Sequence, residues 1–150
     1  MSATLIAHDA RRVEAFYQRW SSDVFVFCRL FLGDEREAER MVSRAFLDFY
    51  RESSVLPLGD GLPAHLIGFA YRAMQPCRPV PAQSLGGSLE KCLAYLDSRQ
   101  RAVFIARNVL GVAWPSVAVA TGLVIEEVKK LWLAGMLKVR DLLPRDFFNR

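Results

Sequence analysis

Cysteine and histidine are scarce in this sequence. The 150 residues include three cysteines, Cys28, Cys77 and Cys92, and two histidines, His8 and His65. The cysteines form no C-x-x-C pair, and neither histidine stands at metal-ligand spacing from a cysteine. The sequence therefore predicts neither a metal site nor a cofactor, and we interpret the cysteines as buried free thiols of a reducing cytosol.

Catalytic patterns and long apolar runs are missing as well. Neither histidine has a nucleophile around it in the sequence, and carboxylates at catalytic spacing are absent, so an enzyme is not expected. No apolar run reaches the roughly 20 residues that a membrane span needs. The opening MSATLIAHDARR also lacks the basic and long apolar segments of a secretory signal. We therefore expect a cytoplasmic protein with no membrane partner.

Apolar residues are plentiful by contrast. Hydrophobic residues make up 52% of the chain and charged residues 24%, so the chain can bury a core and is not expected to be disordered. The formal net charge of +4 is compatible with an anionic partner without requiring one. No segment alternates apolar and polar residues for long enough to form a strand pair. The expected fold class is therefore all-α, with two small helical lobes.

Helical periodicity defines the first lobe, which we assign to residues 1–75. Between residues 10 and 31, apolar residues recur every three or four positions, as they do along one face of a helix. Gly33 ends this helix, and Asp34 can cap a second one. A third helix is expected from about Pro63 to Gln75, and the three helices together form a small bundle.

A linker and a second lobe follow. Residues 76–88, PCRPVPAQSLGGS, are rich in proline and glycine and predict a linker that is flexible unless a partner or direct packing fixes the lobes. The second lobe covers residues 89–150. Within it we expect a helix capped by Asp97 or Ser98 and a last helix from about Ile125 to Leu143.

The second lobe contains a helix-turn-helix pattern, SVAVATGLVIEEVKK, from Ser116 to Lys130. The first helix of such a motif needs a small residue where the second helix crosses it, and the turn needs a residue that tolerates a positive φ. Ala118 and Gly122 meet these needs. A glycine between two helices with apolar flanks also describes ordinary helical hairpins, so the motif alone leaves both interpretations open.

The surroundings of this motif resemble a known family. The stretch LAYLDSRQRAVFIARNVLGVAWPSVAVATGLVIEEVKKLWLAGMLKVRDLL is similar to the C-terminal, region-four domain of extracytoplasmic-function (ECF) sigma factors, including the polar RQR before the turn motif. The stretch FYQRWSSDVFVFCRLFLGDEREAERMVSRAFLDFYRE resembles the family's region-two lobe, which binds core RNA polymerase. LPAHLIGFAYRAM resembles the helix that contributes to promoter opening. Together the resemblances cover nearly the whole chain.

The resemblance implies two sets of contact residues. On the second helix, the implied polymerase-binding set is Glu37, Arg40, Met41, Ser43 and Arg44. On the last helix, the implied DNA-binding set is Glu126, Glu127, Lys129, Lys130, Lys138 and Arg140. Ala118 and Gly122 form the turn that orients this helix.

The polymerase-binding set departs from the family pattern in its charge. Arg40 and Arg44 replace residues that are usually acidic, so the charge of this face is partly reversed. The two arginines either contact a partner or pair with Glu37 and Asp48 as solvated helix charges, an arrangement that contributes only a few tenths of a kcal/mol per pair.

The DNA-contacting regions depart from the family pattern too. Leu131, Ala134 and Met136 stand where family members commonly have arginines. The remaining cations can contact phosphates, and such contacts position a protein without specifying a sequence, so we expect weakened sequence reading. Few aromatic and cationic residues remain to hold an opened promoter strand: Phe69, Tyr71, Arg72 and Arg78.

Two aromatic pairs in the second lobe allow alternatives. Trp114 and Trp132 either fill the core of this lobe or stack on bases. Phe147 and Phe148, in RDFFNR, either mark an interface or pack locally against the final helix.

Two functions are therefore predicted. The first is a bacterial ECF-like sigma factor that binds core RNA polymerase and promoter DNA to direct transcription initiation, with weak or non-specific DNA binding by the isolated protein. The second is a sigma-like regulator, a negative effector or adaptor, that acts through protein contacts and has lost promoter reading. An anti-sigma or sigma-type protein is a further candidate partner.

Overall fold

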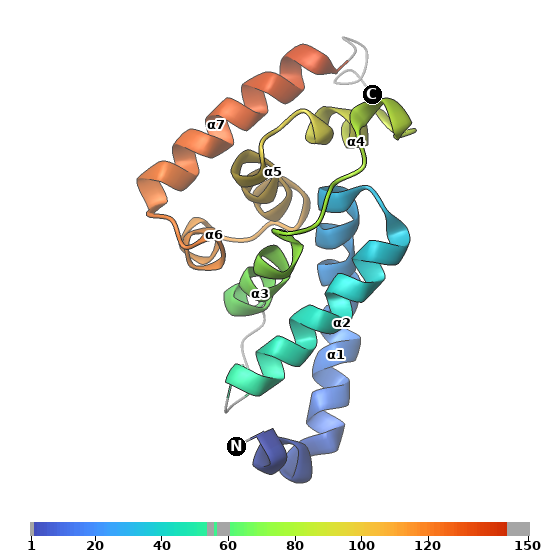
Figure 1. Ribbon diagram of the computed structural model, residues 1–150. Helices are drawn as coiled ribbons and strands as arrows, with labels where there is room; N and C mark the ends of the chain where they lie inside the picture. Colours follow the sequence, from blue (N-terminus) through green and yellow to red (C-terminus); the bar gives the residue numbers. More distant parts are fainter. Residues whose placement is uncertain (1, 54–55, 57–60, 144–150) are drawn as a thin grey trace.

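The chain folds into helices connected by short loops (Figure 1). The computed structural model describes residues 2–53, 56 and 61–143, and their side chains from residue 10 on. Phe147 and Phe148 lie outside the described residues. The described part contains no strand, which confirms the all-α prediction. Its elements in chain order are α1 (Ser2–Leu32), α2 (Glu35–Glu52), α3 (Ala64–Met74), a short 3₁₀ turn η1 (Ala82–Ser84), α4 (Ser88–Ala94), α5 (Ser98–Phe104), a π-helical turn η2 (Ile105–Val109), α6 (Trp114–Thr121) and α7 (Ile125–Leu142).

Local signals fix the junction between α1 and α2. Gly33 follows α1 with a φ of 78°, a conformation that a residue with a side chain rarely adopts. Asp34 then caps α2, because its side-chain oxygen accepts a hydrogen bond of 3.1 Å from the backbone N–H of Glu37. Both features were predicted. The α1 helix begins at Ser2, before the apolar repeat of residues 10–31. Residues 2–9 contain no proline or glycine that would stop a helix.

Aromatic side chains form the core of the first lobe. The rings of Phe16 on α1 and Phe49 on α2 are stacked with their centroids 5.2 Å apart. Phe69 on α3 meets Phe49 edge-on at 6.2 Å, so all three helices contribute to one aromatic cluster. The opposite face of α2 remains free to carry exposed polar residues.

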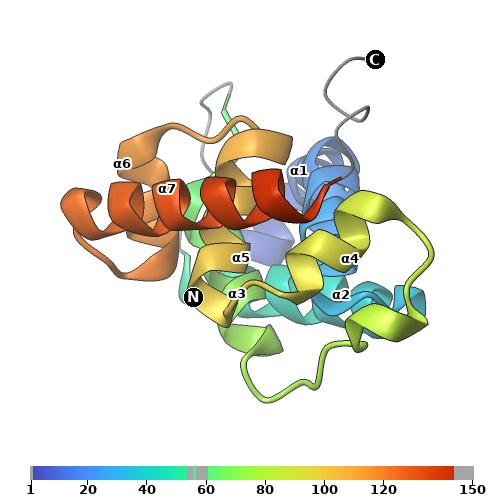
Figure 2. The same cartoon turned by 90° about the horizontal axis from the view of Figure 1, so that it is seen from above.

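In the second lobe, α7 lies across α5 and beside α4 (Figure 2). Asp97 caps α5 in a capping box: it accepts from the backbone N–H of Gln100 at 2.9 Å, while the Gln100 side chain accepts from the N–H of Asp97 at 3.3 Å. The Trp114 and Trp132 rings meet edge-on at 5.4 Å and are both half-buried, as a core role for the pair predicts.

The two lobes pack directly on each other through α3 and α6 (Figure 1). The helices approach so closely at Gly68 that a Cβ there would lie 3.2 Å from the carbonyl oxygen of Ala120. The linker is also held, because the backbone N–H of Val80 donates to the carbonyl of Leu32 at 2.8 Å. The lobes are therefore joined by direct packing. The sequence prediction of a flexible linker names such packing as a condition under which the lobes are fixed.

A buried arginine adds a polar tie between the lobes. Arg101 on α5 donates to the carbonyls of Leu93 at 2.9 Å, Ala94 at 3.3 Å and Leu96 at 2.8 Å. Its Nη1 also donates to the carbonyl of Phe31 at the end of α1, at 2.9 Å. Burial lowers the pKa of Arg101, while Asp97 opposes that shift. The second arginine of the RQR sequence thus fixes the α4–α5 turn and binds it to α1.

The cysteines are free, but they are not all buried. Cys28 and Cys92 lie in the core, whereas Cys77 is half-buried with its Sγ 3.9 Å from Met41 Sδ. Burial, reinforced by the nearby Cys77, raises the pKa of Cys28 to about 12. The prediction of buried thiols is therefore wrong for Cys77, which lies three residues beyond the end of α3 and is only half-buried. Within the described chain, no helix has the length and apolar character needed to cross a membrane.

Candidate functional site

The predicted polymerase-binding residues lie on one side of α2. Arg40, Ser43 and Arg44 are exposed, while Glu37 and Met41 are half-buried. Arg40 Nη1 lies 2.7 Å from Glu37 Oε1, and Arg44 Nε lies 3.2 Å from Asp48 Oδ2. The predicted ion pairs are therefore present.

These ion pairs leave the guanidinium groups available to a partner. The side chains of Arg40 and Arg44 are 72% and 64% exposed. Exposed pairs of this kind contribute about 0.3–0.5 kcal/mol each, so a partner can replace them at little cost. Leu47, which is 51% exposed, follows Ser43 and Arg44 by one helical turn and adds an apolar group that the sequence prediction missed.

One groove borders this face on the side of α3. It has a volume of ≈ 580 Å³, and residues on α2 and α3 line it, including Glu37, Arg40, Met41 and Arg44. On its α3 wall, the guanidinium carbon of Arg72 lies over the ring of Phe69 at 4.5 Å from the centroid. Four of the five predicted polymerase-binding residues therefore meet in one depression.

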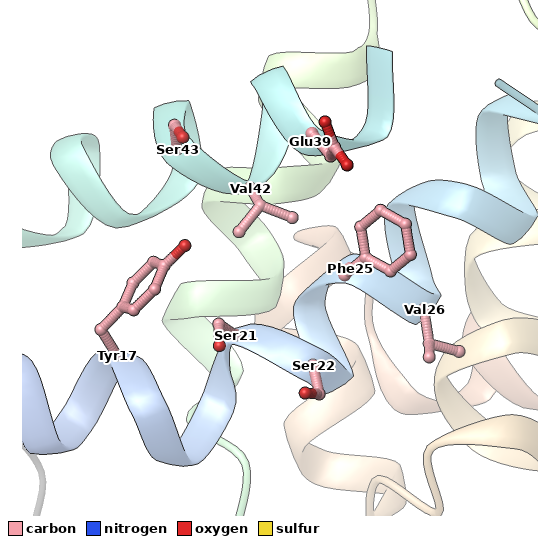
Figure 3. A pocket seen from close by; sticks show the side chains of 8 residues that line it. All are labelled: Tyr17, Ser21, Ser22, Phe25, Val26, Glu39, Val42 and Ser43. Carbon is pink, nitrogen blue, oxygen red and sulfur yellow. The ribbon is translucent and has the colours of Figure 1, made fainter. Parts of the chain in front are cut away.

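The fifth residue, Ser43, borders a second groove between α1 and α2, with a volume of ≈ 530 Å³. Figure 3 shows Val42 on α2 pointing toward the α1 side chains Tyr17 and Phe25, with Ser43 farther along α2. The Tyr17 ring packs edge-on against Phe46, with the centroids 4.8 Å apart. The groove combines hydroxyl groups with apolar walls, and α2 therefore has a depression on both flanks.

The α3 helix, which the sequence resemblance predicts to help open a promoter, exposes few aromatic groups. Phe69 is buried in the aromatic core, and Tyr71 is half-buried with its ring edge-on to Phe31 at 6.0 Å. The rings of Phe69 and Tyr71 thus pack inside the protein and are not available to stack on bases. Arg72 and Arg78 are the exposed residues of this set.

The turn between α6 and α7 has the geometry that the motif requires. Gly122 has a φ of 73°, and its N–H donates to the carbonyl of Ala118 at 2.9 Å. The N–H of Leu123 donates to the same carbonyl at 3.2 Å. Val117 on α6 and Val128 on α7 are fully buried between the helices. The left-handed backbone of Gly122 and the buried side chains of Val117 and Val128 therefore set the direction of α7.

The predicted DNA-binding residues spread along α7 and do not form one patch. Glu126, Lys129 and Lys130 are exposed near its start, and Glu127 is half-buried. Lys138 lies nine positions after Lys129, which turns it about 180° around the helix at roughly 100° per residue.

Contacts within the lobe account for the two cations in the second half of α7. Lys138 Nζ lies 3.2 Å from Gln100 Oε1 on α5. Arg140 lies 3.5 Å from the carboxylate of its neighbour Asp141, with both side chains exposed. Lys129 and Lys130 are adjacent and exposed, and they are the cations of the predicted set that lie nearest the turn.

An apolar groove runs beside the second half of α7, and the sequence prediction missed it. This α7 groove has a volume of ≈ 660 Å³, and its apolar lining comes from Leu89, Phe104, Val109, Trp132, Leu133, Met136, Leu137, Val139 and Leu143. Leu133 is 53% exposed and Leu137 42% exposed. Asn108 accepts a hydrogen bond of 3.2 Å from the indole nitrogen of Trp132, so the polar edge of that ring is satisfied.

Three apolar residues on the surface of the last helix could have indicated this groove from the sequence. Met136 replaces one of the arginines that the resemblance predicts on the reading helix, and it lines the groove. Leu133 and Leu137 are four positions apart and therefore share a helix face. An apolar residue on a helix surface could not be told from a core residue without the tertiary packing.

Comparison with known proteins identifies the fold. No protein-family model and no curated protein matches the sequence. The structure is similar to that of CnrH in complex with the cytosolic domain of CnrY, with a TM-score of 0.76, 18% identity, and coverage of 94% of this chain and 93% of CnrH. It is also similar to the sigma factor RpoE in complex with the anti-sigma factor NepR from Bartonella quintana, with a TM-score of 0.67, 16% identity, and coverage of 86% and 94%. The chain therefore has an ECF sigma-like fold, as the sequence resemblance predicted.

Proposed function

We propose that this chain is an ECF-like sigma factor of the bacterial cytoplasm, whose first lobe binds core RNA polymerase and whose second lobe contacts promoter DNA. The observation that carries the proposal is the likeness to the sigma factor RpoE, which extends over 86% of this chain and so includes both lobes. Since fold does not by itself imply function, the proposal also depends on the surfaces that each lobe presents.

The polymerase contact is assigned to the exposed face of α2. Arg40, Ser43, Arg44 and Leu47 project from consecutive turns, with a groove on each flank. A partner helix that lies along α2 can replace the weak internal ion pairs with its own carboxylates. The reversed charge at Arg40 and Arg44 predicts that the matching polymerase surface carries acidic groups near these positions.

The DNA contact is assigned to the start of α7. Lys129 and Lys130 are exposed just after the turn that orients this helix, and they supply phosphate contacts. Glu126 and Glu127 lie in the same first turns and repel phosphates, although a glutamate can accept a hydrogen bond from cytosine. The expected result is weak DNA binding by the isolated protein, with strong salt dependence and little sequence preference.

A second candidate function is a sigma-like regulator that acts through protein contacts alone. The α7 groove favours it, because an exposed apolar surface on the helix that should read DNA suits a protein partner better than a phosphate backbone. Both similar structures hold a bound protein, the cytosolic domain of CnrY or the anti-sigma factor NepR. A partner of the anti-sigma type is therefore proposed under either function.

Run-off transcription with core polymerase and genomic fragments separates the two functions. A working sigma factor yields discrete transcripts that require the chain, and the double variant Arg40→Glu, Arg44→Glu yields fewer. If the chain binds polymerase but yields no transcript from any fragment, the protein-contact regulator is favoured. If the folded chain neither binds polymerase nor supports transcription, the sigma-factor proposal is wrong.

A further inference from the structure

Two sulfur atoms meet in the groove between α2 and α3. Cys77 Sγ lies 3.9 Å from Met41 Sδ, although the two residues are 36 positions apart in the sequence. Both side chains are half-buried and line this groove, so a small ion can reach them from solvent. The thiol also lies 3.9 Å from the carbonyl oxygen of Ala73. A thiol is a weak hydrogen-bond donor, so Cys77 can exchange these contacts for a stronger bond.

A third sulfur is buried nearby. Cys28 on α1 is fully buried, and no hydrogen-bond partner is described for its thiol. Burial raises the pKa of Cys28 to about 12, and the charge of Cys77 contributes to that shift, so the two thiols lie close together. Neighbouring thiolates repel each other, and a cation bound between them removes the repulsion. A thiol that coordinates a metal is deprotonated outright, so the raised pKa does not prevent binding.

The distance between Met41 and Cys77 suits a shared metal ion. A metal–thiolate bond is about 2.3 Å long. Two sulfurs that bind one ion at angles between tetrahedral and trigonal therefore lie about 3.8–4.0 Å apart. The observed distance of 3.9 Å falls in this interval, so both sulfurs can bind the same ion without a rearrangement of the helices.

The types of donor select a soft cation. Zinc sites in proteins use cysteine, histidine and carboxylate ligands, and a thioether is not among them. In the part of the chain that the structure describes, no three such side chains come together in a way that could hold a metal ion. Thiolate and thioether sulfurs together instead favour Cu(I). Sequence spacing predicts no metal site, because these donors come from distant parts of the chain.

We propose that Met41, Cys77 and Cys28 form a binding site for one Cu(I) ion, at the boundary between this groove and the core of the first lobe. As each cysteine sulfur binds the ion, its proton passes to solvent, and no electron is transferred. The ion links α1, α2 and the segment that follows α3. Because Met41 and Arg40 line the same groove, binding also changes the surroundings of the predicted polymerase-binding residues. The site itself does not depend on the proposed function.

Competition with a chromogenic Cu(I) chelator tests the three ligands. The full chain, kept anaerobic, should take up one Cu(I) ion. Met41→Leu conserves the side-chain volume but removes the thioether, and it should weaken binding by about tenfold or more. Met136→Leu, at another half-buried methionine, is the matched control and should leave the affinity unchanged. Cys28→Ala should weaken binding by a similar factor, whereas Cys92→Ala, at another buried thiol, should not.

Two spectroscopic measurements use the unaltered chain and so remain decisive if a variant fails to fold. X-ray absorption of the Cu(I) complex should show three sulfur neighbours. In methyl NMR spectra, Ag(I), a soft cation that is not readily oxidised, should shift the signal of Met41 and leave those of Met74 and Met136 in place. Fewer than three sulfur neighbours, an unshifted Met41 signal, or full affinity in Met41→Leu would overturn the proposal, because each would assign the ion to a cysteine thiol without the thioether or the third sulfur.

Discussion

The contact between Gly68 and Ala120 gives the sharpest test of how the lobes are joined. A Cβ added at Gly68 would lie 3.2 Å from the carbonyl oxygen of Ala120 and 3.5 Å from its Cα. Both contacts are with backbone atoms, which cannot move aside as the end of a side chain can. The variant Gly68→Ala must therefore push α3 and α6 apart by a few tenths of an ångström.

The α7 helix provides a matched control. Gly135 is also inside a helix and buried, but the nearest atom to an added Cβ is 3.8 Å away, an ordinary contact distance. Replacing a helical glycine by alanine stabilises a helix by about 1 kcal/mol. Overpacking costs about 1–3 kcal/mol. We therefore expect Gly135→Ala to raise the free energy of unfolding by about 1 kcal/mol, and Gly68→Ala to change it by between about 0 and −2 kcal/mol.

Urea denaturation of the two variants measures this difference directly. The m-values should stay equal, so that the change in midpoint reports the change in the free energy of unfolding. A Gly68→Leu variant places a larger side chain between α3 and α6 and should lower the free energy of unfolding further. Equal stabilisation by Gly68→Ala and Gly135→Ala would refute the close packing of α3 on α6.

Three further predictions concern single surfaces or contacts. Arg101→Met should lower the free energy of unfolding by about 3 kcal/mol or more in a denaturant titration, because each buried carbonyl that loses its donor costs about 1–3 kcal/mol; a loss below about 1 kcal/mol would contradict the tie between the lobes. Arg40→Glu with Arg44→Glu should change that free energy by less than about 1 kcal/mol yet weaken capture of core polymerase in a pull-down, and unchanged capture would exclude this face. Lys129→Ala with Lys130→Ala should reduce the slope of log affinity against log salt by about 1.8 in duplex titrations, and an unchanged slope would remove both lysines from the DNA contact.

Much of the fold follows from interactions between near neighbours in the sequence. Asp34 caps α2 by accepting a hydrogen bond from the residue three positions later, Glu37. Arg40 and Arg44 pair with acidic residues three or four positions away, so the sequence spacing predicts all of these contacts. The turn at Gly122 is similarly local, because the residue type and its place between two apolar helices determine the backbone geometry.

Contacts between distant residues could not be predicted in this way. The hydrogen bond from Arg101 to Phe31 joins residues 70 positions apart, and nothing in either local sequence specifies it. The α7 groove has the same origin: Leu133 and Leu137 have the spacing of core residues, and only the arrangement of α4, α5 and α7 leaves them exposed. The roles of the predicted contact residues remain predictions, since a surface acquires a role only from the partner that it meets.

Binding of the purified chain to core RNA polymerase tests the central claim most directly. The chain, labelled at its amino terminus, is titrated with core polymerase, and its fluorescence anisotropy is recorded with and without an unlabelled sigma factor as competitor. The sigma-factor account predicts saturable binding that the competitor displaces and that the double variant Arg40→Glu, Arg44→Glu weakens. Absence of binding by the folded chain at micromolar polymerase, or binding that the competitor leaves untouched, would contradict it.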